Sequence, residues 1–383
     1  MTWFIEVTVL LTSLALMILA YFKWCFTYWA RKGVPYVKPQ IPLGNAPNPL
    51  NLKRPLFETF REYHDYFKSK GHRYGGIFTS TRPTLMVVDP ELVKNVLSKD
   101  FDYFSNRGLY FNKKADPLSL HLFSLEGQEW KDLRRKLTPT FTSGKMKMMF
   151  QTLLDSGNNM MKHLNGTYFD DTAVKIKTIC QSYTIDNIGS CAFGLECNSF
   201  ENPTSDFIRY GQKLFAAPIG KQLRNLLADA FPNFASKLGV KVFDEDVSGF
   251  YKKMTQDTIE YRESNNVHRK DFMQLLLEMK RSQLNEEGLT LDQIAAQSML
   301  FFAGGFETSA TTMSFALFEL ARNPDIQEKV RGEVRSVLDK NDGLLTYDGV
   351  MEMKYMMQVV KGKWGKFNIR KLQLVSNEKM MEI

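Results

Sequence analysis

The motif GGFETS at residues 304–309 places a carboxylate beside a hydroxyl inside a long apolar stretch. Glu307 and Thr308 together could relay protons to a molecule bound next to them. Gly304 and Gly305 carry no side chains, so a flat ligand could lie against the backbone at this point. Each glycine costs a helix interior about 1 kcal/mol relative to alanine, which indicates that something requires close access to the backbone here. The motif is therefore a candidate reaction site.

A structural interpretation of the same motif is also open. The two glycines could form a packing notch, and Glu307 could be a buried carboxylate that pairs with an arginine, a lysine or backbone donors. Residue types alone do not decide between a reaction site and a packing feature.

A second candidate site consists of Trp130 and Arg134, which are four residues apart and would share one face of a helix. An indole N–H and a guanidinium group suit a carboxylate that must be held in place. The alternative is an ordinary amphipathic helix, because two residues at this spacing are too short a pattern to identify a site.

The element that must position the first motif is a helix over residues 290–323. It is apolar on every face, which is typical of a helix in the interior of a large protein. Thr290 and Gln293 have the spacing of a capping box at its start. Asn323 and Pro324 predict its end and the start of a second helix, with Asn323 as the N-cap.

The rest of the sequence predicts a mainly α fold with a small β-sheet. The pattern predicts a helix over residues 55–70 and two short strands, Ile77–Ser80 and Thr84–Val88, around a turn at Arg82 and Pro83. Residues 151–290 are mostly helical by periodicity.

Residues 1–30 predict a membrane anchor, because residues 3–29 are apolar over a length that can cross a bilayer. We expect an aromatic belt at its end, formed by Trp24, Tyr28 and Trp29. Basic residues follow the run, so the positive-inside rule places the bulk of the chain in the cytosol. A cleaved signal peptide is the alternative, but the run is long and lacks a basic start. Residues 31–50 predict a proline-rich hinge.

Composition excludes several classes of function. The net charge of +8 calls for an anionic membrane surface or an acidic protein as partner, and the sequence has no phosphate-binding loop or zinc spacing that would indicate nucleic acid. The five histidines form no i,i+3 or i,i+4 pair, so we expect no metal site built from protein side chains. The four cysteines are too scattered for a disulfide scaffold and are expected to be reduced thiols.

The motif at residues 304–309 resembles the signature Ala/Gly-Gly-x-Asp/Glu-Thr-Thr/Ser in the central helix of cytochrome P-450 monooxygenases. The run from Trp130 to Phe141 is similar to a helix of the same family. The order of anchor, prolines, helix, hairpin and helix also resembles the start of a microsomal member, specifically the insect enzymes that oxidise plant toxins and insecticides.

The resemblance implies a cofactor and a role for each candidate residue. It implies heme, with Trp130 and Arg134 on a propionate. The small residues Gly304 and Gly305 would make room for dioxygen, and Glu307 and Thr308 would manage protons. It also implies a substrate pocket lined by three aromatic residues, namely Phe123, Phe302 and Phe306.

The same resemblance implies partners and a location. We expect electrons from NADPH through an NADPH-cytochrome reductase, which would dock as an acidic partner beside Lys131, Arg135 and Lys136. An ordinary solvated helix face is the alternative explanation of these three basic residues. The substrates would be lipophilic small molecules. The protein would be a single-pass protein of the endoplasmic reticulum membrane with its catalytic part in the cytosol.

Residues 51–360 are expected to form a partial, incomplete P-450 domain, followed by a tail at residues 361–383 that departs from the family. The resemblance implies that the chain would continue into the motif E-x-x-R and later into a loop whose cysteine thiolate binds the iron. Neither pattern is present in this sequence. None of the four cysteines lies in such a loop, so none is expected to bind the iron. Oxygen activation depends on that thiolate, so we expect this chain to be catalytically incompetent. It would be a truncated splice form or an incomplete gene model.

Two alternatives belong to other classes of function. The chain could be a membrane-anchored decoy that binds lipophilic ligands or the reductase without turnover. It could also serve a purely structural role in a membrane. A full-length transcript across codon 360 would separate an interrupted enzyme from a decoy.

Overall fold

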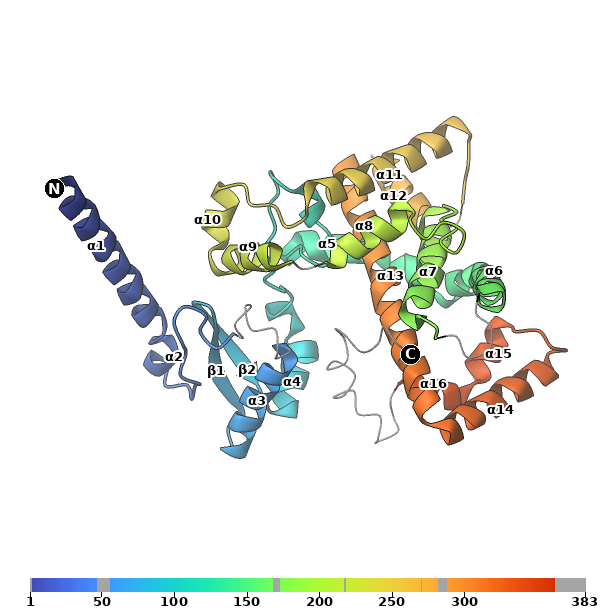
Figure 1. Cartoon of the computed structure of the whole chain (residues 1–383), viewed down its shortest axis with the longest axis horizontal. Coiled ribbons are helices and arrows are strands. Elements are labelled where there is room, and N and C mark those ends of the chain that lie inside the picture. The colour runs from blue at the N-terminus through green and yellow to red at the C-terminus, as the bar shows by residue number, and fades with distance from the viewer. Residues whose placement is uncertain are drawn as a thin grey trace. The chain divides into compact units, whose positions relative to one another are not determined.

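A computed structural model describes residues 2–46, 56–167, 173–216, 218–269, 271–281 and 288–361. Part of the predicted hinge, including Pro47 and Pro49, lies outside the described residues, as does the predicted tail after residue 361. The prediction of a mainly helical fold with a small sheet is confirmed by the described elements (Figure 1).

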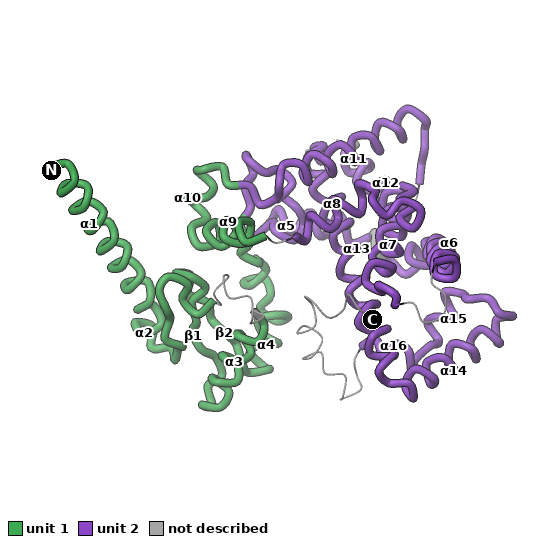
Figure 2. Tube along the Cα trace, in the orientation of Figure 1, with its two compact units in different colours: residues 1–110, 217–240 green, residues 111–216, 241–383 purple. Residues whose placement is uncertain are grey.

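The chain divides into two compact units (Figure 2). Unit 1 contains residues 1–110 and 217–240, and unit 2 contains residues 111–216 and 241–383. All candidate site residues named above belong to unit 2.

Unit 1 is built on a two-stranded antiparallel sheet. Its elements are α1 (Thr2–Cys25), α2 (Tyr28–Arg31), α3 (Leu56–Ser69), β1 (Tyr74–Thr79), β2 (Arg82–Val87), α4 (Pro90–Lys94), the π-helical turn η1 (Asn95–Lys99), the 3₁₀ turn η2 (Phe101–Tyr103), α9 (Ile219–Ala230) and α10 (Pro232–Lys237). Ser80 adopts a positive φ of 55° between the strands, so the turn falls at residues 80–81. Pro83 instead pairs with Phe78 inside the ladder, which corrects the predicted turn position.

The helix α1 is long and apolar enough to cross a membrane, and nearly all of its side chains are exposed. The chain then docks on the sheet. The indole N–H of Trp29 in α2 donates to the carbonyl of Ile77 at 2.9 Å, and a Cβ at Gly76 would lie 2.4 Å from the Trp29 ring. Trp29 is therefore packed on β1, whereas the sequence predicts it in an interfacial aromatic belt.

The described part of the proline-rich segment also pairs with β1. The amide of Gly76 donates to the carbonyl of Pro35 at 2.8 Å, and the amide of Val37 donates back to the carbonyl of Gly76 at 3.0 Å. The Asn45 side chain accepts from the amide of Phe78 at 2.8 Å. Up to residue 46 this part of the predicted hinge is thus held on β1 by isolated bridges, Tyr36 with Gly76 and Gly44 with Thr79.

Unit 2 is helical. Its elements are the 3₁₀ turn η3 (Pro117–Ser119), α5 (Gly127–Leu137), the 3₁₀ turn η4 (Thr138–Phe141), α6 (Ser143–Thr167), α7 (Ile176–Ile188), the π-helical turn η5 (Gly189–Phe193), α8 (Asp206–Phe215), α11 (Glu245–Ser264), α12 (Phe272–Arg281), α13 (Leu291–Arg322), α14 (Pro324–Lys340), α15 (Tyr347–Glu352) and α16 (Lys354–Val360). The core of this unit packs around α13 (Figure 1).

The helix α13 begins and ends where the sequence predicts. Thr290 accepts from the amide of Gln293 at 3.2 Å, and the Gln293 side chain accepts from the amide of Thr290 at 2.8 Å, which confirms the capping box. At the other end Asn323 occupies the N-cap position of α14, but its side chain donates to the carbonyl of Glu319 at 2.8 Å. Asn323 therefore closes α13 rather than capping α14.

Candidate active site

One face of α13 is left open within the described structure. Gly304 and Thr308, one turn apart, are both exposed. A Cβ built at Gly304 would meet no described atom within 4 Å outside its own helix. The Thr308 hydroxyl donates to the carbonyl of Gly304 at 2.6 Å, so its oxygen keeps lone pairs for a group on the open side. We call these two positions the open strip.

The neighbouring glycine has a different surrounding. A Cβ at Gly305 would lie 2.6 Å from the side chain of Ile188 at the end of α7. Gly305 therefore lets α7 approach α13 closely. The sequence assigns both glycines to ligand access, but in this arrangement only Gly304 faces open space.

The Glu307 carboxylate points toward α7. It forms an ion pair with Lys177 and accepts from the Gln181 amide at 2.9 Å. The Thr311 hydroxyl donates to the same carboxylate at 3.2 Å and accepts from the Lys177 ammonium at 2.5 Å. The cationic partner required by the structural interpretation of Glu307 is thus present. Its side chain and that of Thr308 lie on different sides of α13.

Phe302 and Phe306 lie in the packed core of unit 2 and have no exposed surface. Phe302 contacts the rings of Phe207 and Tyr251, with centroids 6.2 and 5.5 Å away. The ring centroid of Phe306 is 6.1 Å from that of Phe215. Both residues share the side of α13 that packs on α7, α8 and α11, so the structure places them in the packed core of unit 2. Their role in lining a substrate pocket stays a prediction.

Trp130 and Arg134 lie on α5, as the sequence predicts. Trp130 is half-buried and packs against the hydrophobic core of unit 2. Arg134 is exposed, and among the described residues its guanidinium forms no ion pair. Its neighbour Arg135 differs, because it pairs with Asp132 at 2.9 Å. An exposed, uncompensated guanidinium beside an indole remains able to bind a carboxylate.

Phe123 lies on the segment that leads into α5 and is 51% exposed. The backbone of this segment is bonded to α13 by a residue that sequence reasoning missed. Gln297 accepts from the amide of Leu122 at 2.9 Å and donates to the carbonyl of Leu120 at 3.1 Å. A buried glutamine in an otherwise apolar helix was the signal that could have identified it.

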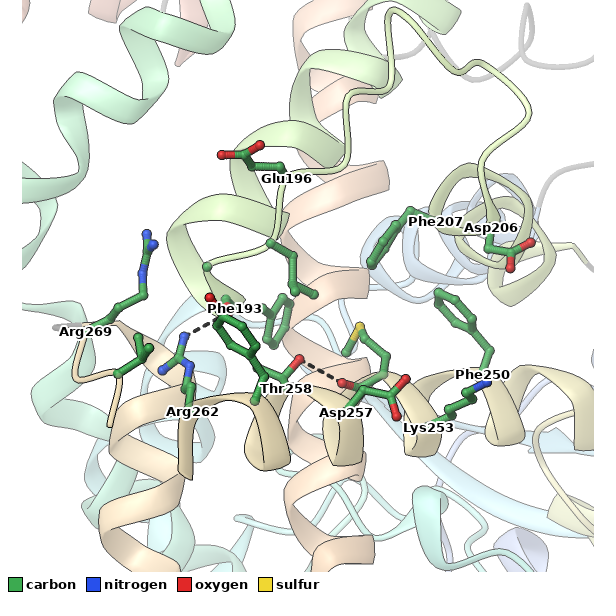
Figure 3. Close-up of a pocket in the computed structure, with 15 residues that line it drawn as sticks. Phe193, Glu196, Asp206, Phe207, Phe250, Lys253, Asp257, Thr258, Arg262 and Arg269 are labelled. Carbon is green, nitrogen blue, oxygen red and sulfur yellow. Dashed lines mark hydrogen bonds between the residues drawn. The ribbon is translucent and has the colours of Figure 1, made fainter. Parts of the chain in front are cut away.

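A cavity of about 750 Å³ lies elsewhere in unit 2, between α8, α11 and the loops after η5 and α11 (Figure 3). Phe193, Phe207 and Phe250 form part of its walls. At one end Arg262 donates to the carbonyl of Phe193 at 2.8 Å. None of the candidate residues from the sequence lines this cavity.

Three of the four cysteines lie in surroundings that favour neutral thiols. Burial raises the pKa of the Cys197 thiol to about 12, and it also raises the pKa of Cys180 and of Cys191. Cys25 lies at the end of α1. Without a bound cation these three thiols are therefore protonated at neutral pH.

The family model for cytochrome P450 matches residues 42–361, and the chain belongs to this family. Members of the family bind heme.

The chain is 40% identical to cytochrome P450 6A1 of Musca domestica, an alignment that covers 93% of this chain and 70% of the relative. It is 40% identical to cytochrome P450 6a2 of Drosophila melanogaster, over 88% of this chain and 68% of the relative. It is 38% identical to cytochrome P450 6a8 of the same fly, over 87% and 67%. The chain thus groups with insect cytochromes P450 of the xenobiotic-metabolising type.

The described residues fit one side of a heme and its propionate. Gly304 leaves a flat, side-chain-free surface on α13, and Arg134 provides an exposed guanidinium for a carboxylate.

Proposed function

We propose that this protein is a heme-dependent monooxygenase that inserts one oxygen atom of O₂ into lipophilic compounds such as xenobiotics. Electrons would come from NADPH through a flavoprotein reductase. The observation that carries the proposal is the open strip: on the side of α13 opposite to the core of unit 2, Gly304, which has no side chain, and Thr308 are exposed one turn apart. Bound heme would supply the activation of oxygen.

Each residue has a proposed task at this strip. Gly304 leaves room for dioxygen. The Thr308 hydroxyl, which donates its hydrogen to the Gly304 carbonyl, accepts or passes on a proton through its own oxygen. Glu307 exchanges protons with solvent, since 24% of its side chain is exposed. It delivers them to Thr308 after the carboxylate turns from Lys177. Gly305 supports this arrangement by allowing α7 to pack against α13.

Trp130 and Arg134 are proposed to hold a heme propionate. The half-buried indole fixes the position of α5 on the core, and the exposed guanidinium supplies the charge. Phe123 is proposed to contact the substrate. Lys131 and Lys136, on the same helix, are proposed to attract an acidic reductase.

The anchor α1 is proposed to hold the protein in the endoplasmic reticulum membrane with the remainder in the cytosol. Its length and apolar composition, together with the basic residues Arg31 and Lys32 that follow, support this orientation.

We further propose that Cys180, Cys191 and Cys197 do not supply the iron ligand, because all three are packed among core residues and burial raises the pKa of each thiol. The second candidate function, a membrane-anchored decoy for lipophilic ligands or the reductase, follows from the same observation. A transcript that continues from codon 360 into E-x-x-R and a cysteine loop would favour the enzyme. A stop near codon 383 would favour the decoy.

Two measurements test the proposal. Purified chain should take up heme, monitored by visible absorbance, and Arg134→Leu should weaken that uptake while Arg135→Leu should not. In a product that contains the cysteine loop, Thr308→Ala should release peroxide and separate NADPH consumption from product formation. Undiminished coupling would remove Thr308 from the mechanism, and absence of heme uptake in both products would overturn the heme proposal.

A further inference from the structure

The cavity beside α11 is separate from the open strip, because neither Gly304 nor Thr308 lines it (Figure 3). Its volume of about 750 Å³ lies within the range of sites that hold drug-sized molecules, roughly 300–1,000 Å³. Its walls come from the loop after η5, the first turn of α8, one face of α11 and the loop after α11. All of these segments belong to unit 2, so one compact unit forms the cavity.

One face of α11 runs along the cavity. Its lining residues recur at the spacing of three and four that places side chains on one side of a helix, and they are Phe250, Lys253, Met254, Asp257, Thr258 and Tyr261. Met254 and Thr258 are buried, and the Thr258 hydroxyl donates to the Met254 carbonyl at 2.7 Å. Lys253 and Asp257 are exposed. The face therefore combines a buried base with charged groups at its rim.

Two phenylalanines form an aromatic wall of the cavity. The rings of Phe207 on α8 and Phe250 on α11 meet edge to face, with centroids 5.5 Å apart. Phe207 also contacts the ring of Phe302 at 6.2 Å, and Phe250 contacts that of Tyr251 at 5.1 Å. Both of these supporting rings are fully buried, so the core fixes the wall in place. Aromatic walls attract cations, and quaternary ammonium groups are commonly recognised by them.

The carboxylates at the rim favour a cation for a second reason. Asp257 and Glu196 are exposed and form no ion pair within the part of the chain that the structure describes. A third carboxylate, that of Asp206, pairs with Arg209 at 2.8 Å. Lys253 opposes these charges, but its long side chain is exposed and can turn toward solvent.

The arginines at one end of the cavity are already engaged. Arg262 binds the Asp271 carboxylate at 2.6 and 2.8 Å and donates to the Phe193 carbonyl at 2.8 Å. Arg269 contacts the same carboxylate at 3.3 Å. An anionic ligand would have to compete with the buried Asp271 for these guanidinium groups. A cationic ligand would place its charge toward Asp257 instead.

We propose that this cavity is a binding site for amphipathic ammonium compounds, which join an apolar aryl or alkyl body to a tertiary or quaternary ammonium group. The body packs on Phe207, Phe250 and Met254. The ammonium group lies beside the Asp257 carboxylate, in contact with the aromatic wall. The site needs no heme, so its test is independent of the proposed monooxygenase function.

Isothermal titration calorimetry measures the binding of 4-phenylbutyltrimethylammonium to the full chain in phosphatidylcholine nanodiscs, with empty nanodiscs as the reference. The anion 4-phenylbutanesulfonate carries the same hydrocarbon body and is the comparison. We expect the cation to bind at least about tenfold more tightly, because the aromatic wall and Asp257 both attract positive charge. Absence of binding by the cation would overturn the site, as would equal or tighter binding of the anion.

Two substitutions on α11 should change the affinity for the cation in opposite directions. Asp257→Asn should weaken binding about fivefold, because it removes the exposed counter-charge. Lys253→Met should strengthen binding several-fold, because it removes a like charge and adds apolar surface. The matched control is Glu260→Gln, which removes one negative charge from an exposed position on the same helix outside the cavity lining. Equal weakening by Asp257→Asn and Glu260→Gln would reveal only general attraction to acidic surface and would overturn the site.

Hydrogen exchange locates the bound probe. Saturating 4-phenylbutyltrimethylammonium should slow exchange of backbone amides in residues 194–206 and 250–262, which contribute to the cavity. Protection confined to residues 300–309 would place the probe at the open strip and would overturn this second site while leaving the proposed function standing. Absence of protection in both regions would also overturn it.

Discussion

Lys177 on α7 and Glu307 on α13 form an ion pair between residues 130 positions apart in the sequence. The Gln181 side-chain amide and the Thr311 hydroxyl also donate hydrogen bonds to the Glu307 carboxylate, at 2.9 and 3.2 Å. The acid that is proposed to deliver protons is therefore also a link between two helices of the core. Any variant of Glu307 changes both properties, so Lys177 is the better place to separate them.

We expect Lys177→Met to lower the free energy of unfolding by about 1 kcal/mol. The variant leaves a partly buried carboxylate without its cation, but 29% exposure of Lys177 and 24% of Glu307 allows solvent to screen the loss. Urea unfolding followed by circular dichroism measures the change. Lys175→Met, at an exposed position before the same helix, should have no effect, and an equal loss in both variants would contradict the assigned link.

Alanine at the two adjacent glycines should have opposite effects on stability. Gly304→Ala should raise the free energy of unfolding by up to about 1 kcal/mol, because alanine favours the helix and its methyl group meets open space. Gly305→Ala should lower it by about 1–3 kcal/mol, because the methyl group would collide with Ile188 at 2.6 Å. Thermal unfolding of both variants tests the pair. Heme uptake should be preserved in Gly304→Ala, because the family signature accepts alanine at this position.

Stability should depend on pH through His121. Burial lowers the pKa of this imidazole to about 4 from its ordinary 6.5, so the unfolded chain binds the proton more tightly than the folded one. The stability that the neutral ring contributes is fully present above pH 6.5. It is lost as the pH falls toward 4, and the total loss of unfolding free energy is about 3 kcal/mol.

The measurement for His121 is the unfolding free energy of the unaltered chain and of His121→Leu at several pH values from 7 to 4. The difference between the two should shrink or reverse toward acid, because the variant has no ring to protonate. His72→Leu, at an exposed position, provides the control. A constant difference across the range would show that His121 does not titrate in this window.

The buried pair of Arg262 and Asp271 should matter more for stability than the surface pairs. Their side chains are only 3% and 6% exposed, and the two groups are joined at 2.6 and 2.8 Å. Arg262→Met should lower the free energy of unfolding by about 3 kcal/mol, because it leaves a buried carboxylate with less compensation. Arg209→Met, which breaks an exposed pair with Asp206, should cost less than about 1 kcal/mol. Equal unfolding midpoints for the two variants would contradict this ranking.

Local sequence signals were sufficient to place the helices that carry the site. The ends of α13 follow from Thr290, Gln293 and Pro324, because caps and breakers act over three or four residues. The strands were found but their turn was misplaced by two residues, since Arg82 and Pro83 resemble a turn while Ser80 supplies the positive φ. The order of secondary structure was therefore predictable, and its fine register was not.

The surroundings of the site required the structure. The sequence gives Glu307 no visible partner, because Lys177 and Gln181 meet it only when α7 crosses α13. For the same reason it could not show that Gly305 faces Ile188 or that Phe302 and Phe306 face the core. Such contacts join residues more than fifty positions apart, beyond the reach of periodicity and spacing.

The docking of Trp29 on β1 has a mechanical consequence. Helices in bilayers tilt and rotate to match the thickness of the surrounding lipid. A flexible linker would absorb that movement. Trp29 instead donates a hydrogen bond to the Ile77 carbonyl, and its ring packs against Gly76, which has no side chain. A change in bilayer thickness that tilts or rotates α1 is therefore expected to rotate the sheet of unit 1 with it.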